Sequence, residues 1–178
     1  LKTYVIQNGI AEDDRFFWFT TTGWMMWNFL VSALLVGAAI ILYDGSPFYP
    51  SGDVLWELAE KTGMTFFGTS AGYIASCMKA GIKPGKKYDL SKLKALGSTG
   101  SPLTTEGFAW VYEQVKRDLW LVSISGGTDV CTGFVGGSPL LPVRAGEIQC
   151  RHLGVKVEAF DEQGGSLIDE VGELVVTK

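Results

Sequence analysis

The sequence predicts an α/β fold, a mostly parallel sheet with flanking helices, followed by a short antiparallel β segment. After Gly37, apolar runs of strand length alternate with segments whose apolar residues recur at helical spacing, which is the pattern of a parallel sheet. Beyond Pro139, short strand-like runs follow one another around polar, glycine-containing turns, which is typical of antiparallel strands. We therefore expect an α/β part over residues 1–140 and a β-rich part over residues 141–178.

Three helices are expected between the strands of the α/β part. The run VLWELAEKT ends before Gly63, whose conformational freedom suits a helix C-terminus. The segment AGYIASCMKA has Ser70 as its N-cap and Gly81 just beyond its last turn. The third helix has Thr104 or Thr105 as its N-cap and carries its apolar residues on one face.

The expected strands of the α/β part are the runs AAIILYD, MTFFGTS, LKALGSTG and DLWLVSISGG, and those of the β-rich part are VKVEAFDEQGG and GELVVTK.

The first strand closes a nearly uncharged run from Gly23 to Gly45, which is long enough to span a bilayer. Gly37 interrupts this run, and no cluster of Lys and Arg flanks it. We therefore expect a buried helix followed by a buried strand, and no membrane segment.

The composition narrows the class of function. A net charge of −4 and a pI near 5.0 argue against a nucleic-acid partner. Three cysteines without CxxC spacing favour a reducing compartment, and the chain opens with mixed polar residues, so we expect a cytoplasmic protein without a signal peptide. His152 is the single histidine and has no second histidine to help hold zinc, so a surface or hydrogen-bonded structural role is expected for it.

Two loops rich in Gly, Ser and Thr follow neighbouring strands, over residues 97–103 and 123–129. Ligands of open α/β sheets bind beyond the carboxyl ends of the strands, so these loops could form one wall of a nucleotide site. Thr128 could donate a hydrogen bond to a phosphate oxygen, and Asp129 is a hard oxygen ligand that suits Mg²⁺. Both loops fit ordinary turns equally well, because neither GxxxxGK[ST] nor GxGxxG is present.

One stretch favours a different class of enzyme. Residues 68–72, GTSAG, match the nucleophile-elbow pattern, so a serine hydrolase using Ser70 is an alternative. His152 would have to act as its base from within the β-rich part. The role of helix N-cap is favoured for Ser70.

Five motifs occur in order along the chain: FFWFTTTGWMMWN, LYDGSP, STGSPL, SISGGTD and GELVVTK. Together they resemble the acyl-adenylate-forming superfamily, and within it the acetoacetyl-CoA synthetases, over essentially all 178 residues. The resemblance implies a ligase of fatty-acid and ketone-body metabolism. ATP and a short 3-oxo acid, acetoacetate, would give an acyl-adenylate and pyrophosphate, and CoA would then displace AMP to form the thioester.

The resemblance also implies roles for individual residues. STGSPL matches the loop that packs on the adenine, which implies cofactor contacts for Gly100, Ser101 and Pro102. SGGTD matches the motif whose Thr contacts the adenylate phosphate, which makes Thr128 the catalytic residue. The residues of this loop that would contact the cofactor are Ser125, Gly126, Gly127 and Thr128.

Asp129 takes the place of the family's Mg²⁺-binding Glu and is one methylene shorter, so coordination through a water is an alternative to direct binding. Trp24 and Met25 match the aromatic segment that helps line the acyl pocket, although such residues fit a core as well. Related acetyl-CoA synthetases carry a tryptophan at the position of Gly126, so Gly126 implies substrate contact and room for a longer acid.

The family's lysine-ended phosphate loop would precede residue 1, and its ribose-binding Asp, hinge and C-terminal domain would follow GELVVTK. We therefore expect the middle of a larger enzyme, with a partial adenylate site and no activity in isolation. Its expected partners are the acid, ATP, CoA and the missing parts of the enzyme, and unpaired sheet edges predict self-association. A non-catalytic nucleotide- or acyl-binding module of the same fold, or a purely structural domain, is the alternative.

Overall fold

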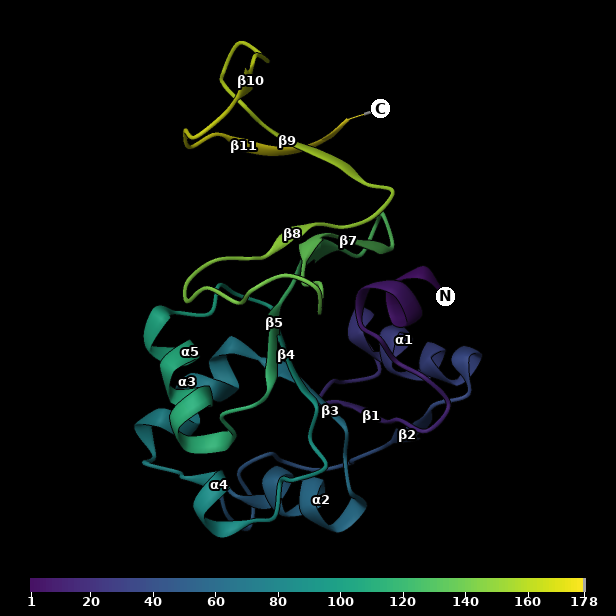
Figure 1. Cartoon of the computed structure of the whole chain (residues 1–178), viewed down its shortest axis with the longest axis vertical. Helices are drawn as coiled ribbons and strands as arrows, with labels where there is room; N and C mark the ends of the chain where they lie inside the picture. The colour runs from purple at the N-terminus through teal and green to yellow at the C-terminus, as the bar shows by residue number, and fades with distance from the viewer. Residues whose placement is uncertain (178) are drawn as a thin grey trace.

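The computed structural model describes residues 1–177 and contains a five-stranded parallel sheet and two small antiparallel sheets (Figure 1). The order of the parallel strands is β2-β1-β3-β4-β5. Their bounds are Arg15–Trp18 for β1, Ala39–Ile41 for β2, Phe66–Ser70 for β3, Ala95–Thr99 for β4 and Trp120–Ser123 for β5. This architecture confirms the predicted fold class. The sequence did not predict β1, which lies between β2 and β3.

Within the described residues, five α-helices connect these strands. They are α1 at Met25–Ser32, α2 at Val54–Thr62, α3 at Ala71–Lys79, α4 at Pro84–Lys87 and α5 at Thr105–Trp110. A 3₁₀ turn extends α1 over Ala33–Val36, and π-helical turns occupy Thr3–Gln7 and Val111–Val115. The predicted helix ends are confirmed: Gly63 adopts a left-handed φ of 61°, and the side chains of Ser70 and Thr104 cap α3 and α5.

The sheet separates two apolar cores because successive side chains of a strand point to opposite faces. Phe17 and Phe67 face the core built with α2, α3 and α5, where Trp56 stacks on Phe67 with ring centroids 4.5 Å apart. Phe16 and Phe66 face the core built with α1, and the two helix layers lie on either side of the sheet in Figure 1. Both faces of the central strands are therefore buried.

The apolar run from Gly23 to Gly45 forms a helix and then a strand, as predicted, but the expectation that both are buried is wrong. No residue of β2 is buried, because β2 pairs only with β1 and lies at the edge of the sheet. Leu34 and Leu35 are 57% and 70% exposed. Within residues 1–177, no helix is both long enough and apolar enough to cross a membrane.

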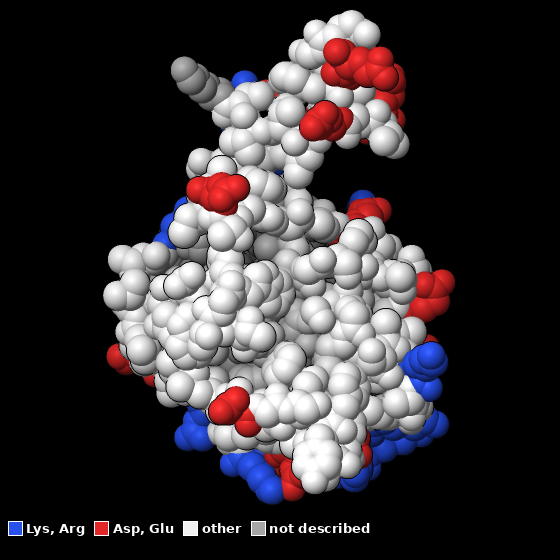
Figure 2. Space-filling model, turned by 180° about the vertical axis from the view of Figure 1, so that it is seen from behind, with Lys and Arg blue, Asp and Glu red and all other residues white. Residues whose placement is uncertain are grey.

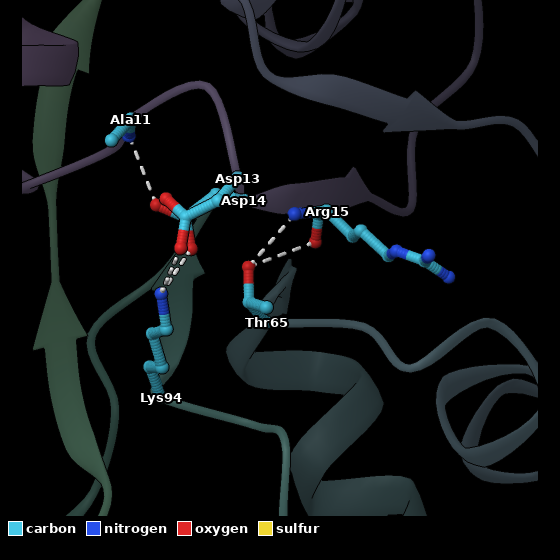
Figure 3. A network of polar contacts seen from close by, with 6 residues as sticks. All are labelled: Ala11, Asp13, Asp14, Arg15, Thr65 and Lys94. Atoms are coloured by element: carbon cyan, nitrogen blue, oxygen red, sulfur yellow. Dashed lines mark hydrogen bonds and ion pairs between the residues drawn. The ribbon is translucent and has the colours of Figure 1, made fainter.

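A polar network joins the amino ends of the parallel strands (Figure 3). Asp14 accepts hydrogen bonds from Lys94 Nζ at 2.8 Å and from the backbone N–H of Ala11 at 2.9 Å. Thr65 Oγ1 accepts the backbone N–H of Arg15 at 2.9 Å. Burial by itself would raise the pKa of Asp14, but these donors hold it below its ordinary value. The network thus connects the amino ends of the parallel strands, at the end of the sheet opposite to the glycine-rich loops.

The remaining strands are antiparallel. Their bounds are Ser125–Gly127 for β6, Thr132–Gly136 for β7, Cys150–Arg151 for β8, Lys156–Phe160 for β9, Ser166–Leu167 for β10 and Glu173–Thr177 for β11. Strands β6, β7 and β8 form one sheet, and β10, β9 and β11 form another, which lies beyond β7 and β8 in Figure 1. The predicted strands of the β-rich part are confirmed as β9 and β11. Antiparallel pairing already begins at Ser125, so the division into residues 1–140 and 141–178 stays a prediction.

Candidate functional site

A cavity of about 760 Å³ opens at the carboxyl ends of β4 and β5. Its size falls in the range of small-molecule sites, about 300–1,000 Å³. The residues to which the sequence assigned nucleotide or acyl contacts all line this cavity: Trp24, Met25, Gly100, Ser101, Pro102, Ser125, Gly126, Gly127 and Thr128. The structure thus brings together three separate segments of the chain. The roles of the individual residues stay predictions.

Hydrogen bonds hold the two glycine-rich loops side by side. Thr99 Oγ1 donates to the carbonyl of Ile124 at 2.7 Å, and the N–H of Ile124 donates to the carbonyl of Ser98 at 2.9 Å. Just beyond, Gly100 has a φ of 87°, which L side chains rarely adopt. A Cβ at Gly100 would lie 3.8 Å from the indole of Trp24. The loop after β4 therefore turns directly beside the start of α1.

Thr128 lies in the turn of the β6–β7 hairpin, which Cys131 closes by donating its N–H to the Thr128 carbonyl at 3.0 Å. Thr128 is exposed toward the cavity. Asp129 is exposed in the same turn but does not line the cavity. Among the described residues, no group of three or more His, Cys, Asp or Glu side chains could hold a metal ion. One carboxylate beside the cavity fits Mg²⁺ only where substrate phosphates supply further ligands, which is how Mg²⁺ is usually bound.

Gly126 is required by a close approach of the backbone. A Cβ at this position would lie 2.6 Å from the carbonyl oxygen of Thr132 and 2.9 Å from the Cα of Gly133. A side chain at Gly126 would therefore point at β7. The close approach of β7 accounts for the glycine, and a role in leaving room for a longer acid stays a prediction. A tryptophan at this position would require the backbone of the hairpin to follow a different path.

His152 also lines the cavity, which the sequence did not predict. It is only 4% exposed, and its Nδ1 has no hydrogen-bond partner among the described residues. The ring lies against two glycines of β7: a Cβ at Gly133 would be 2.4 Å from its Cε1, and a Cβ at Gly136 would be 2.2 Å from its Nε2. Burial, assisted by the charge of Lys2, lowers the pKa of His152 to about 4. The imidazole is therefore neutral at pH 7, and the expectation of a surface position for His152 is wrong.

Ser70 has the structural role that its sequence context favoured. Its Oγ accepts the backbone N–H of Tyr73 at 3.1 Å, at the N-terminus of α3. Ser70 does not line the cavity, whereas His152 does. The structure therefore gives no support to a hydrolytic pair of these two residues.

The cavity has almost no charged residues in its wall. Glu147 is the one Asp, Glu, Lys or Arg among the lining residues that the structure describes. Figure 2 shows a broad face of the molecule that carries few charged side chains and is hollowed near its middle, with most of the blue Lys and Arg side chains along its lower rim. Any anion bound in the cavity would rely on N–H and O–H groups from this chain.

The parallel sheet, with two glycine-rich loops meeting at its carboxyl edge, is the fold of the N-terminal domain of adenylate-forming enzymes. The family model described as "AMP-binding enzyme" matches residues 2–178, and the chain belongs to this family.

Three relatives illustrate the similarity. Acetoacetyl-coenzyme A synthetase of Rhizobium meliloti (strain 1021) is 50% identical over the whole chain, which spans 27% of that protein. Acetoacetyl-CoA synthetase of Gallus gallus is 44% identical, again over the whole chain and 27% of its own length. The solved structure of acetoacetyl-CoA synthetase from Streptomyces lividans has a TM-score of 0.92 and 51% identity, and it covers 99% of this chain and 28% of its own. The chain thus corresponds to about a quarter of these proteins.

Proposed function

We propose that this chain is the central part of an AMP-forming acid–CoA ligase that activates acetoacetate. One observation carries the proposal: every residue to which the family resemblance assigned a nucleotide or acyl contact lines the same cavity. The similarity to acetoacetyl-CoA synthetases over the whole chain supports acetoacetate as the acid. In the first step a carboxylate oxygen attacks the α-phosphorus of ATP and pyrophosphate leaves. In the second step the CoA thiol attacks the acyl carbonyl and AMP leaves.

The loops contribute donors for the phosphate and a surface for the base. The hydroxyl of Thr128 would donate to an α-phosphate oxygen, together with backbone N–H groups of the loop after β5. Gly100, Ser101 and Pro102 would pack on the adenine, next to the indole of Trp24. Asp129 would supply one oxygen ligand to Mg²⁺, directly or through a water, and the phosphates would supply others.

The acyl group would lie against α1. Met25 lines the cavity beside Trp24, and both offer apolar surface to a short acyl chain. Gly126, in strand β6 of the β6–β7 hairpin, also lines the cavity and allows β6 to pair closely with β7. The acid would therefore be held between the helix and the hairpin.

The chain by itself should bind an adenylate but not catalyse. Within residues 1–177, no Lys or Arg lines the cavity, so little positive charge is available to stabilise the transition state at the α-phosphorus. We propose that other parts of the full enzyme supply this charge. A non-catalytic adenylate-binding module is the second candidate, and it shares the binding site but lacks turnover in any context.

We also propose a cytoplasmic location, because none of the three cysteines forms a disulfide.

The edge strand β2 and the exposed leucines beside it favour self-association of the isolated chain. Size-exclusion chromatography of the chain at high concentration measures this directly. A monomer at every concentration would contradict the proposed self-association.

Calorimetric titration with a non-hydrolysable acyl sulfamoyl adenosine tests the site. Binding should weaken about tenfold to a hundredfold in Thr128→Ala, because a hydrogen bond to a charged group is lost. Thr177→Ala on β11, far from the cavity, is the matched control and should bind like the unchanged chain. AMP keeps its phosphate, so its binding is measured with and without Mg²⁺. Asp129→Asn should remove the effect of the metal on AMP binding. Equal binding in Thr128→Ala and Thr177→Ala would contradict the proposed site.

A further inference from the structure

The face of α1 that borders the cavity carries two polar residues in an otherwise apolar segment. Between Gly23 and Gly37, Asn28 and Ser32 are the only residues with a hydroxyl, amide or charged side chain. Both line the cavity. A spacing of four residues places them on one face of the helix, one turn apart. The polar interruptions of this segment are therefore both directed to the site.

The two residues differ in their surroundings. Ser32 is half-buried beside Tyr4: burial raises the pKa of Tyr4 to about 12, and the neighbouring Ser32 hydroxyl partly offsets this rise. Tyr4 in turn donates to the carbonyl of Phe29 at 2.5 Å, so Ser32 belongs to a contact between α1 and the N-terminal turn. The side-chain amide of Asn28 is exposed and makes no hydrogen bond within residues 1–177.

Asn28 has no structural reason to be an amide. It lies in the interior of α1, whose N-cap is Trp24, so it caps neither end of the helix. Asparagine is also less favourable than leucine or methionine in a helix interior. Met25 and Phe29 of the same helix also line the cavity and offer only apolar surface to it. A single amide donor in an apolar wall suits a ligand with one acceptor on a hydrocarbon chain.

We infer that Asn28 determines the preference for 3-oxo acids by donating its Nδ2–H to the ketone oxygen of the acyl chain. This inference rests on the proposed function. A ketone oxygen accepts hydrogen bonds, whereas the corresponding methylene of butyrate cannot. A bound butyryl group would cover the amide and leave it without a partner. Sites that hydrogen-bond a polar group discriminate in this way against analogues that lack it.

The test compares two acyl sulfamoyl adenosines, acetoacetyl and butyryl, by calorimetric titration of the 178-residue chain. The unchanged chain should bind the acetoacetyl compound about tenfold to a hundredfold more tightly. Asn28→Leu should weaken acetoacetyl binding by about that factor and leave butyryl binding unchanged or tighter. Asn28→Asp, which keeps the size but lacks the N–H donors, should lose the preference as well. Ser32→Ala is the matched control and should keep it.

The outcomes separate the inference from the proposed function on which it rests. If neither compound binds the folded chain, the adenylate site itself is refuted and the inference falls with it. If both bind but the unchanged chain shows no preference, only the inference is overturned. The same holds if Asn28→Leu retains the full preference. Thermal unfolding followed by circular dichroism checks that each variant is folded.

Discussion

The narrow fit of His152 against β7 makes Gly136→Ala a sharp test of the structure. The new Cβ would lie 2.2 Å from Nε2 and 2.9 Å from Cδ2 of His152. The optimum separation of non-bonded carbon atoms is about 3.5–4.0 Å. The ring is only 4% exposed, so its displacement would disturb the packing around it. Overpacking of this kind costs about 1–3 kcal/mol of unfolding free energy.

The measured loss should be smaller than this, because alanine also reduces the entropy of the unfolded chain. Gly136 is not at a positive φ, so alanine fits its backbone and recovers about 0.5–1 kcal/mol. The net loss should therefore lie between about 0 and 2.5 kcal/mol. In a His152→Ala background the clash is absent, and the same substitution should be neutral or stabilising. The two changes should therefore couple by at least about 1 kcal/mol.

Urea unfolding followed by tryptophan fluorescence measures all four free energies of this double-mutant cycle. Gly23→Ala is the matched control, since a Cβ there meets nothing within 4 Å, and it should raise the free energy of unfolding by no more than about 1 kcal/mol. An equal cost of Gly136→Ala in both backgrounds would refute the reasoning, because it would mean that the imidazole does not occupy the space beside β7.

Three further changes are expected. His152 is the only histidine, and its pKa falls to about 4 on folding, so the unfolded chain binds a proton that the folded chain does not. Urea unfolding at successive pH values should show stability falling by up to about 3 kcal/mol as the pH drops from 6.5 toward 4, and a flatter profile in His152→Leu. Asp14→Ala should lower the unfolding free energy by about 1–3 kcal/mol, since it removes the acceptor of two hydrogen bonds at the amino edge of the sheet; an unchanged urea midpoint would contradict this. Ser70→Ala should cost about 1 kcal/mol in the same assay through the lost N-cap and leave adenylate binding unchanged, and loss of a hydrolytic activity in this variant would revive the alternative enzyme class.

Helix ends were predictable from the sequence because cap chemistry is local. Gly63 takes the left-handed conformation at the end of α2, and Ser70 accepts an N–H three residues away. Strand β1 was not predicted, because RFFW is an interior strand that pairs with β2 on one side and β3 on the other. Three of its four residues are buried, so the run shows no alternation of polar and apolar positions.

The site was predictable in part, because the fold class determines where its loops lie. The loops after β4 and β5 follow strands of a parallel sheet, so their convergence follows from the fold class. The β6–β7 hairpin was not predicted, because its glycine-rich strands have low β propensity, and β7 is held by pairing with β8. His152 reaches the cavity only through long-range packing against Gly133 and Gly136, for which the local sequence around residue 152 contains no signal.

The central claim is that three separate segments form one binding site: the start of α1, the loop after β4 and the hairpin after β5. Amide hydrogen exchange, measured with and without an acyl sulfamoyl adenosine, tests it most directly. We expect slower exchange in residues 97–103, in residues 123–133 and in α1, with no change in β9 or β11. Binding that protects β9 and β11 but leaves both loops unchanged would contradict the account.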